Sequence, residues 1–444
     1  MAHTSTSVPI IPWVRTRLAA MMFLQCAIFG AWLPLLWPFL SNVRKFSATD
    51  IGYAFAVGAL GAIIAPFVAG QIADRYFNTE KFLGISHIVG GILVFQLASI
   101  ESLSGFLIFS FAYSLVTSPT LPLTNSLSLH HIDRDRDFAK VRLWGTVGWI
   151  VVGLGVGQWL FHQHTPALGT PVEIAAAQFA GMADAFRLAG VLGVVMGLYC
   201  FTLPATPPVA GVKRNATFEA LSRVRVQPLL VLFLLAVPIS CIHQFYFVHA
   251  AGFLGAYQLN AGEDGFTRFV NGLFGVGGVG LMTIGQMSEI AVLALIPLAA
   301  VRWTRKSLLA VGIVAYALRM FLFAEPANMA AALGVSQLAI LIPAIALHGV
   351  CFGCFIFLGF MIVDEETSDD VRASAQSLYN LVIVGIGTIV GSFVATEVAV
   401  WASSGGAMDY SKLFGVPMYG SLGCLAVLAL FYQGGARAKA QARG

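Results

Sequence analysis

The sequence contains few charged residues. Only 10% of its 444 residues are Asp, Glu, Lys or Arg, while 58% are hydrophobic and the mean hydropathy is +0.82. A soluble domain carries about 25% charged residues. This composition therefore excludes a soluble globular protein and indicates a chain that crosses the membrane many times. The net charge of +4 is scattered through loops and does not predict nucleic-acid binding.

Cysteine is also scarce, with six residues that all fall in apolar stretches. Cys351 and Cys354 form a C-x-x-C in the middle of a predicted helix, without a second pair, so we interpret them as packing residues and expect no metal site and no cofactor. The sequence offers no nucleophile elbow or phosphate loop, which argues against a membrane enzyme. We expect no cleavable signal peptide, because the first apolar stretch is too long and lacks an A-x-A site.

Apolar windows of about 20 residues predict an all-α protein with twelve transmembrane helices. They are expected at 17–40, 51–73, 82–100, 104–130, 139–161, 184–203, 227–256, 269–301, 306–324, 335–363, 372–400 and 414–433. A polar link, 204–226, separates an N-terminal six-helix half, 1–203, from a C-terminal half, 227–444. Most Lys and Arg residues lie in loops on one side, so the positive-inside rule predicts that both termini and this link are cytoplasmic.

Glu289 is the only ionisable residue in the predicted helix 269–301. A carboxyl group at bilayer depth is unfavourable by several kcal/mol unless it is protonated, paired or hydrated, so it marks a functional site. Gln286 lies one turn earlier on the same face. Five glycines between 272 and 280 allow a neighbouring backbone to approach closely.

Arg142, Thr146 and Trp149 share one face of the fifth predicted helix, at i, i+4 and i+7. A guanidinium, a hydroxyl and an aromatic ring on one stripe suit a polar ring that is hydrogen-bonded and stacked. The alternative is that Arg142 reaches the cytoplasmic surface while the other two pack.

Other polar residues lie in helices of the C-terminal half. The seventh predicted helix has a polar cluster, in which Gln244 is the best candidate ligand contact, and its residues face either a cavity or partner helices. In the tenth, His348 precedes Phe352 by one turn; this histidine either packs, binds the substrate or carries a proton. Arg319 is interpreted as structural, paired or reaching the interface.

The segment from Gly70 to Arg75 reads G-Q-I-A-D-R and resembles the G-x-x-x-D-R core of the major facilitator loop. Asp74 and Arg75 would form a charge clamp at the cytoplasmic ends of the second and third helices. We therefore predict a gating role for both; the alternative is an ordinary charge pair beside the membrane.

Five further segments carry a resemblance to a known family. They read L-Q-C-A-I-F-G-A-W-L at 24–33, R-L-W-G-T-V-G-W at 142–149, G-Q-M-S-E at 285–289, A-L-R-M-F-L-F-A at 317–324 and R-A-S-A-Q at 372–376. Their order and spacing resemble the nucleoside:proton symporter family of the major facilitator superfamily, over most of the chain. In that family a central cavity between the halves binds a nucleoside.

The resemblance implies a set of site residues. The matching positions are Arg142, Thr146, Gln244, Gln286, Glu289 and Phe352, with Trp149 in place of a phenylalanine. Three positions depart from the family: Phe247 replaces Asn, His348 replaces Tyr and Gly353 replaces Asp. With that Asp missing, Glu289 is left as the sole carboxyl at membrane depth.

The resulting hypothesis is a secondary transporter, not an enzyme, that takes up a nucleoside-like solute together with protons. Glu289 would bind the proton, Gln286 and Gln244 would bond ribose or base, and Trp149 and Phe352 would stack on the ligand. We expect a monomer in the bacterial inner membrane, with the lipid bilayer, protons and the solute as its partners. The alternatives are a facilitator for another small solute such as a sugar, uncoupled or exporting, and a receptor without flux.

Overall fold

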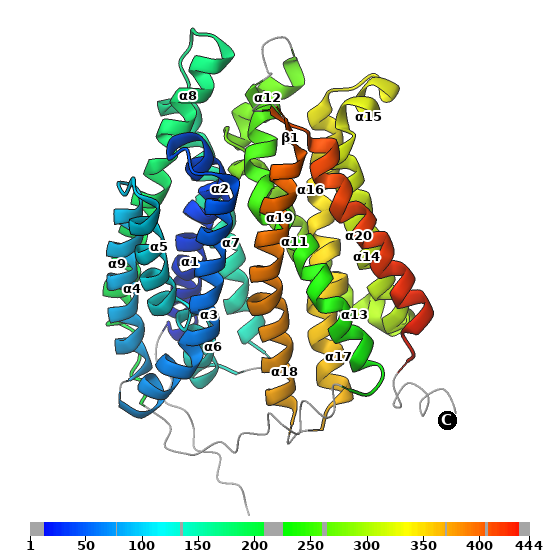
Figure 1. Ribbon diagram of the computed structural model, residues 1–444. Helices are drawn as coiled ribbons and strands as arrows, with labels where there is room; N and C mark the ends of the chain where they lie inside the picture. Colours follow the sequence, from blue (N-terminus) through cyan, green and yellow to red (C-terminus); the bar gives the residue numbers. More distant parts are fainter. Residues whose placement is uncertain are drawn as a thin grey trace, which may run out of the picture.

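The structure is a computed structural model that describes residues 13–76, 78–133, 136–207, 225–259, 264–368, 371–404 and 407–434. Inside these ranges the side chains at 62, 65–76, 373, 404 and 407 lie outside the description. The helices run roughly alongside one another, with the N-terminal helices on one side of the molecule and the C-terminal helices on the other (Figure 1). Most of the predicted link between the halves, residues 208–224, falls outside the described residues, so the exact division stays a prediction.

The N-terminal side consists of helices and short helical turns. They are α1 (Val14–Trp32), the 3-10 turn η1 (Leu33–Leu35), α2 (Leu36–Pro38), the π turn η2 (Phe39–Val43), α3 (Ala48–Tyr76), α4 (Thr79–Leu97), α5 (Leu103–Thr117), α6 (Thr120–His131), α7 (Phe138–Gln163), α8 (Pro171–Gly181) and α9 (Ala183–Cys200). The first apolar stretch therefore begins slightly earlier than predicted and ends in changing helical geometry, around Pro34 and Pro38.

The C-terminal side is helical as well, apart from one small strand pair. It contains α11 (Leu229–Leu259), α12 (Gly265–Phe274), α13 (Val279–Arg302), α14 (Arg305–Ala324), α15 (Pro326–Leu333), α16 (Gln337–Cys351), π segment η3 (Phe352–Phe357), α17 (Leu358–Glu366), α18 (Arg372–Asn380), π segment η4 (Leu381–Ile386), α19 (Gly387–Ala402), β1 (Ser403–Ser404), β2 (Ala407–Met408) and α20 (Tyr410–Phe431). The two strands pair antiparallel over two residues each.

The predicted transmembrane architecture is confirmed. Within the described residues, 11 helical segments are long and apolar enough to cross a membrane. The helix α3 occupies the place of the second predicted span, although part of its side chains is not described. Every one of the twelve predicted spans therefore has a helical counterpart, and the fold is an all-α membrane bundle.

The prediction of one continuous helix over 269–301 is wrong. The chain leaves α12 at Gly275 and enters α13 only after Gly278, and both residues have positive φ, at 72° and 78°. A Cβ at Gly275 would lie 1.9 Å from the carbonyl carbon of Gly157, so only glycine fits there. Gln258 of α11 bridges the break: its amide donates to the Gly275 carbonyl at 2.7 Å and accepts from the Gly278 N–H at 2.8 Å.

The predicted helix 104–130 is also interrupted. It is divided into α5 and α6, with Ser118 and Pro119 between them. Proline lacks an N–H and clashes with the preceding turn, which explains the interruption. The hydropathy window spans both pieces because composition does not change at the break.

Helices α7 and α13 join the two sides of the molecule through close backbone contacts. The Val276 N–H, just before α13, donates to the Gly157 carbonyl of α7 at 3.1 Å, and Gln158 donates to the Leu273 carbonyl at 3.1 Å. A Cβ at Gly153 would meet the Thr283 methyl at 2.8 Å. Glycines of α7 and of the chain just before α13 thus allow the two segments to approach closely, as the glycines between 272 and 280 predict.

Candidate functional site

Glu289 lies in the middle of α13, on the side of the molecule formed by the C-terminal helices. Its side chain is 18% exposed, so the carboxyl is largely removed from solvent. Arg142 of α7 is close enough to interact with it electrostatically, although the two residues belong to opposite sides of the bundle. The structure therefore places the one acidic residue of α13 within electrostatic range of the cationic end of the predicted Arg142–Thr146–Trp149 stripe, without a direct ion pair among the described contacts.

The surroundings of Arg142 show how it reaches this position. Its guanidinium lies beside the Cys26 thiol of α1, and both groups pack over Gly145, where a Cβ would come within 2.7 Å of Arg142 Nη1. Gly145 thus leaves room for the arginine side chain along α7. These contacts place the guanidinium between α1, α7 and α13. Its predicted role in ligand binding stays a prediction.

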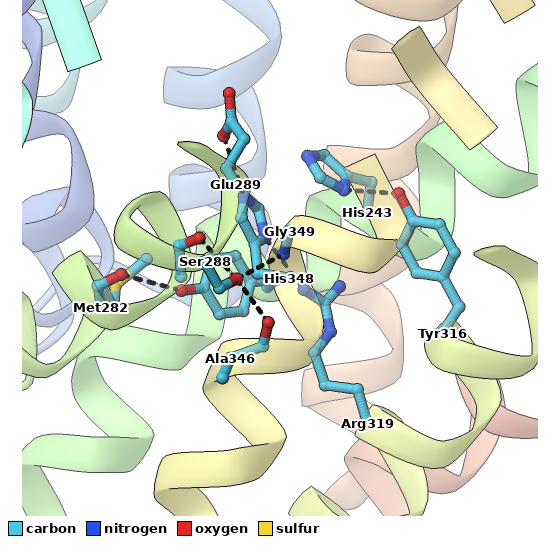
Figure 2. Close-up of polar contacts among 11 residues, drawn as sticks. His243, Met282, Ser288, Glu289, Tyr316, Arg319, Ala346, His348 and Gly349 are labelled. Carbon is cyan, nitrogen blue, oxygen red and sulfur yellow. Dashed lines mark hydrogen bonds and ion pairs between the residues drawn. The ribbon is translucent and has the colours of Figure 1, made fainter. Parts of the chain in front are cut away.

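His348 of α16 lies between Glu289 and a second arginine (Figure 2). Its Nε2 is 4.0 Å from the nearer Glu289 carboxylate oxygen, and its Nδ1 is 3.0 Å from Nη1 of Arg319. The imidazole is 2% exposed and stacks on the ring of Tyr246, with centroids 4.7 Å apart. The predicted proton site, the alternative proton site and an arginine interpreted as structural are consequently parts of one cluster.

Arg319 is completely buried at 0% exposure. Its guanidinium lies over the rings of Tyr246 and Tyr316, at 4.6 Å and 5.2 Å from their centroids. Its Nε and Nη2 atoms have no hydrogen-bond partner among the described residues, and no described carboxylate forms a salt bridge with it. The positive charge therefore contacts aromatic faces and one imidazole nitrogen. Burying a charge with so few partners within the membrane-spanning region is energetically unfavourable.

Ser288 fixes α13 against α16 beside this cluster. Its hydroxyl bonds the Ala346 carbonyl, and the Gly349 N–H donates to the same hydroxyl at 3.0 Å (Figure 2). A Cβ at Gly349 would lie 2.5 Å from the Glu289 backbone nitrogen. These contacts hold the backbones of the neighbouring residues Glu289 and His348 close to one another.

Gln286 is 6% exposed, and its Oε1 is buried without a hydrogen-bond partner in the described chain. A buried amide oxygen normally has a partner, because leaving it unpaired is unfavourable by about 1–3 kcal/mol. This residue lies one turn before Glu289 on α13. The structure thus shows an acceptor with unused capacity next to the predicted proton site.

The other predicted glutamine is already engaged. Gln244 of α11 donates to the Ser392 hydroxyl of α19 at 3.1 Å and is 7% exposed. Two further polar residues of α11 form hydrogen bonds to η4 and α19. Ser240 donates to the Ile383 carbonyl at 2.6 Å, and His249 bonds the Ala395 carbonyl at 3.0 Å. These three polar residues of the seventh predicted span therefore form hydrogen bonds to a neighbouring helix.

The two predicted aromatic residues are both partly buried, but they contact different neighbours. Trp149 of α7 packs over Gly30 of α1, where an added Cβ would lie 3.0 Å from the indole. Thr146, also on α7, is half-buried. Phe352 begins the π segment η3, and its ring centroid is 6.5 Å from that of His243. No described contact joins Trp149 to Phe352, so their joint stacking on a ligand stays a prediction.

The three departures from the family pattern fall around the same cluster. Phe247 lies edge-on to His348 with centroids 6.1 Å apart. At Gly353 a Cβ would meet side-chain atoms of Val292 and Ile296 at 2.8 Å, so this position faces α13 one to two turns beyond Glu289. The family carboxyl that is missing here would therefore have faced α13.

Three further observations concern residues outside the Glu289–His348–Arg319 cluster or missed by the sequence analysis. Gln25 donates to the Thr120 hydroxyl at 2.9 Å and bonds His87 at 2.8 Å, which is a packing role within the N-terminal half. The side chains of Asp74 and Arg75 lie outside the described part, so the gate stays a prediction. Ser288 was missed because a serine inside an apolar helix carries no distinctive sequence signal.

Two groups of membrane-spanning helices, with a largely buried carboxyl near a cation from the opposite group, define a secondary transporter of the major facilitator fold. The chain belongs to the nucleoside H+ symporter family, whose sequence model matches residues 13–437. The predicted family, the class of transporter and the absence of an enzymatic role are in agreement with this membership.

Several known proteins are similar to the chain. YegT of Escherichia coli K12, a provisionally named nucleoside transporter, is 32% identical over 387 residues, which cover 84% of this chain and 82% of YegT. The xanthosine permease of the same organism is 25% identical, covering 91% of this chain and 90% of the permease. A crystal structure of a mutant of the nucleoside transporter NupG superposes with a TM-score of 0.80 at 23% identity, covering 94% of this chain and all of the NupG chain, so the two share a fold.

Proposed function

We propose that this protein accumulates nucleosides in the cell by coupling their entry to proton entry, with Glu289 as the proton site. The observation that carries the proposal is the position of Glu289, in α13 on one side of the bundle and within electrostatic reach of Arg142 in α7 on the other. Family membership supplies the transport class, and the named relatives are transporters or permeases for nucleosides and xanthosine.

The coupling follows from charge. When Glu289 is ionised, its attraction to Arg142 favours the arrangement that brings the two groups together. When Glu289 is protonated that attraction disappears, and the relative energy of arrangements in which α7 and α13 separate falls. Because the carboxyl is only 18% exposed, this attraction is weakly screened. Protonation therefore changes the equilibrium between the conformations of a transporter whose halves move about a central site.

The ligand contacts are proposed from the same region. Gln286 has a buried oxygen without a partner, which suits the hydroxyl or N–H of a nucleoside. Arg142 and Thr146 supply hydrogen bonds from α7, while Trp149 and Phe352 offer an aromatic ring from each side for the base. The Gln244 amide donates to the Ser392 hydroxyl. It would therefore bind the ligand through its other N–H or its oxygen, or after the bond to Ser392 breaks.

The cellular placement follows from the sequence and the family. Basic residues dominate the loops on the side of the two termini, which favours both termini in the cytoplasm of a bacterial inner-membrane protein. We propose a monomer, since the predicted site is formed within one chain. Asp74 and Arg75 would act as the cytoplasmic gate.

The test is transport into proteoliposomes with purified protein. Uridine, adenosine and xanthosine are supplied with and without an inward proton gradient, beside ribose and a disaccharide. We expect gradient-driven accumulation of at least one nucleoside. Accumulation of a sugar and of none of the nucleosides would show that the substrate is a sugar. Uptake at the same rate with and without the proton gradient would refute symport.

Glu289→Gln is the decisive variant, because it keeps the shape of the side chain and removes the titratable group. We expect loss of gradient-driven accumulation, with counterflow partly retained because it needs no net proton movement. The matched control is Glu397→Gln, an exposed carboxyl on α19. Accumulation at the wild-type level in Glu289→Gln would remove this residue from the proton pathway.

A further inference from the structure

Arg319 constrains the protonation of His348 through the geometry of their contact. Its Nη1 lies 3.0 Å from His348 Nδ1, and an arginine nitrogen only donates hydrogen bonds. Nδ1 must therefore accept, which means that it carries no proton. The remaining ring nitrogen, Nε2, then holds the hydrogen of a neutral imidazole, and this nitrogen is the one directed at Glu289, 4.0 Å away (Figure 2).

We propose that Arg319 is a positioning residue that fixes His348 as the neutral Nε2–H tautomer, so that His348 donates to ionised Glu289 and leaves the coupled proton to that carboxyl. The present 4.0 Å separation is longer than a hydrogen bond, and the flexible, partly exposed Glu289 side chain closes it when it loses its proton. This role deepens the proposed function and rests on Glu289 being the proton site.

The neighbours of His348 support a neutral imidazole. Titratable and charged groups approach it from three helices: Glu289 from α13, Arg319 from α14, and His243 and Tyr246 from α11. The His243 ring stacks on it at 5.2 Å, and the Nδ1 of His243 is bonded to the Tyr316 hydroxyl at 2.7 Å. Only Glu289 would favour a charged imidazole, whereas Arg319 makes direct contact and opposes it.

The geometry also gives the buried guanidinium a purpose. Arg319 has no described carboxylate in salt-bridge range, yet His348 places it one imidazole away from Glu289. An ionised Glu289 is then held by cations on both sides: Arg142 from α7 and, through His348, Arg319 from α14. A tyrosine, which the family pattern has at this position, donates a hydroxyl without needing its tautomer fixed. The histidine, unlike that tyrosine, has two neutral tautomers, and the contact with Arg319 selects one of them.

The first test is nitrogen NMR of purified protein in nanodiscs, with labelled histidine and with His348→Gln used to assign the His348 signals. In the wild type we expect the Nε2–H tautomer, unchanged from pH 5 to 8. A wild-type His348 that titrates in this range, or that carries its hydrogen on Nδ1, would overturn the proposal without any variant. This measurement needs no transport, so it can fail or succeed independently of the proposed function.

The second test uses Arg319→Gln and Arg319→Lys, with Tyr316→Phe as a control that removes the neighbouring hydrogen bond to His243. In Arg319→Gln we expect a mixed or titrating His348 signal and a pH midpoint of transport raised by about one unit or more. Arg319→Lys keeps the positive charge and an N–H donor, so its pH midpoint of transport should equal that of the wild type. Tyr316→Phe should leave the His348 tautomer unchanged. A purely structural Arg319 would lower the rate at every pH with no shift in the midpoint, which would contradict the proposal.

Discussion

Replacing Gly349 with alanine tests the geometry that holds Glu289 and His348 together. The added Cβ would lie 2.5 Å from the Glu289 nitrogen and 2.4 Å from the Ser288 hydroxyl, whereas ordinary contact begins near 3.4 Å. Since the atom in the way is backbone, α16 must retreat from α13 by about 1 Å. That movement lengthens the 3.0 Å bond from the Gly349 N–H and weakens the bond from Ser288 to Ala346.

The expected loss of stability follows from these contacts. Overpacking a tight interface is unfavourable by about 1–3 kcal/mol, and each weakened buried hydrogen bond adds about 1 kcal/mol. We therefore expect Gly349→Ala to lower the free energy of unfolding by roughly 3–5 kcal/mol. It should also reduce transport more than it reduces nucleoside binding, because it moves the proton site relative to His348.

The measurement is a thermal melt in detergent, followed by transport of the surviving folded fraction. The matched control is Gly353→Ala, four residues later on the same face, where the Cβ meets only movable side-chain atoms of Val292 and Ile296 at 2.8 Å. The control should lose less than half as much stability. If Gly349→Ala melts no lower than Gly353→Ala, the close backbone contact does not hold the two helices as described.

Three further predictions concern other parts of the molecule. Trp149→Ala should weaken nucleoside binding about tenfold or more in calorimetry, because stacking contributes roughly 1–3 kcal/mol per base and 1.4 kcal/mol is a factor of ten; ribose that binds the wild type as tightly as a nucleoside would refute stacking. Asp74→Asn should slow transport while ligand binding persists, and an unchanged rate in a folded variant would argue against the clamp. Gln258→Leu should lower the melting temperature, since each buried group left unpaired at the helix break, including Gly275 and Gly278, is unfavourable by about 1–3 kcal/mol; an unchanged melt would contradict this role.

The sequence alone determined the membrane class, the helical fold and the family. Long apolar windows are local properties of the chain, because each span must satisfy its own backbone in lipid, and so they can be read without knowing the neighbours. Glu289 was visible for the same reason, as a lone carboxyl in an apolar stretch. The resemblance to the family likewise indicates the departures at Phe247, His348 and Gly353.

Only the tertiary structure decided how these residues are connected. The break at 275–278 depends on the approach of Gly157 and on bonds from Gln258, neither of which is near in sequence. Hydropathy does not register such a break, since glycine continues an apolar window while it changes the backbone. The apolar window therefore predicts one continuous helix over 269–301.

The chemistry of His348 was decided in the same way. The sequence leaves three roles open for this histidine, and it favours a structural role for Arg319, 29 residues earlier, either paired or reaching the interface. The contact between Arg319 and Nδ1 depends on the packing of α14 against α16, and the 4.0 Å approach of Nε2 to Glu289 depends on the Ser288 contact between α13 and α16. A tautomer is set by whichever donor or acceptor lies within about 3 Å, and residue order along the chain does not specify that distance.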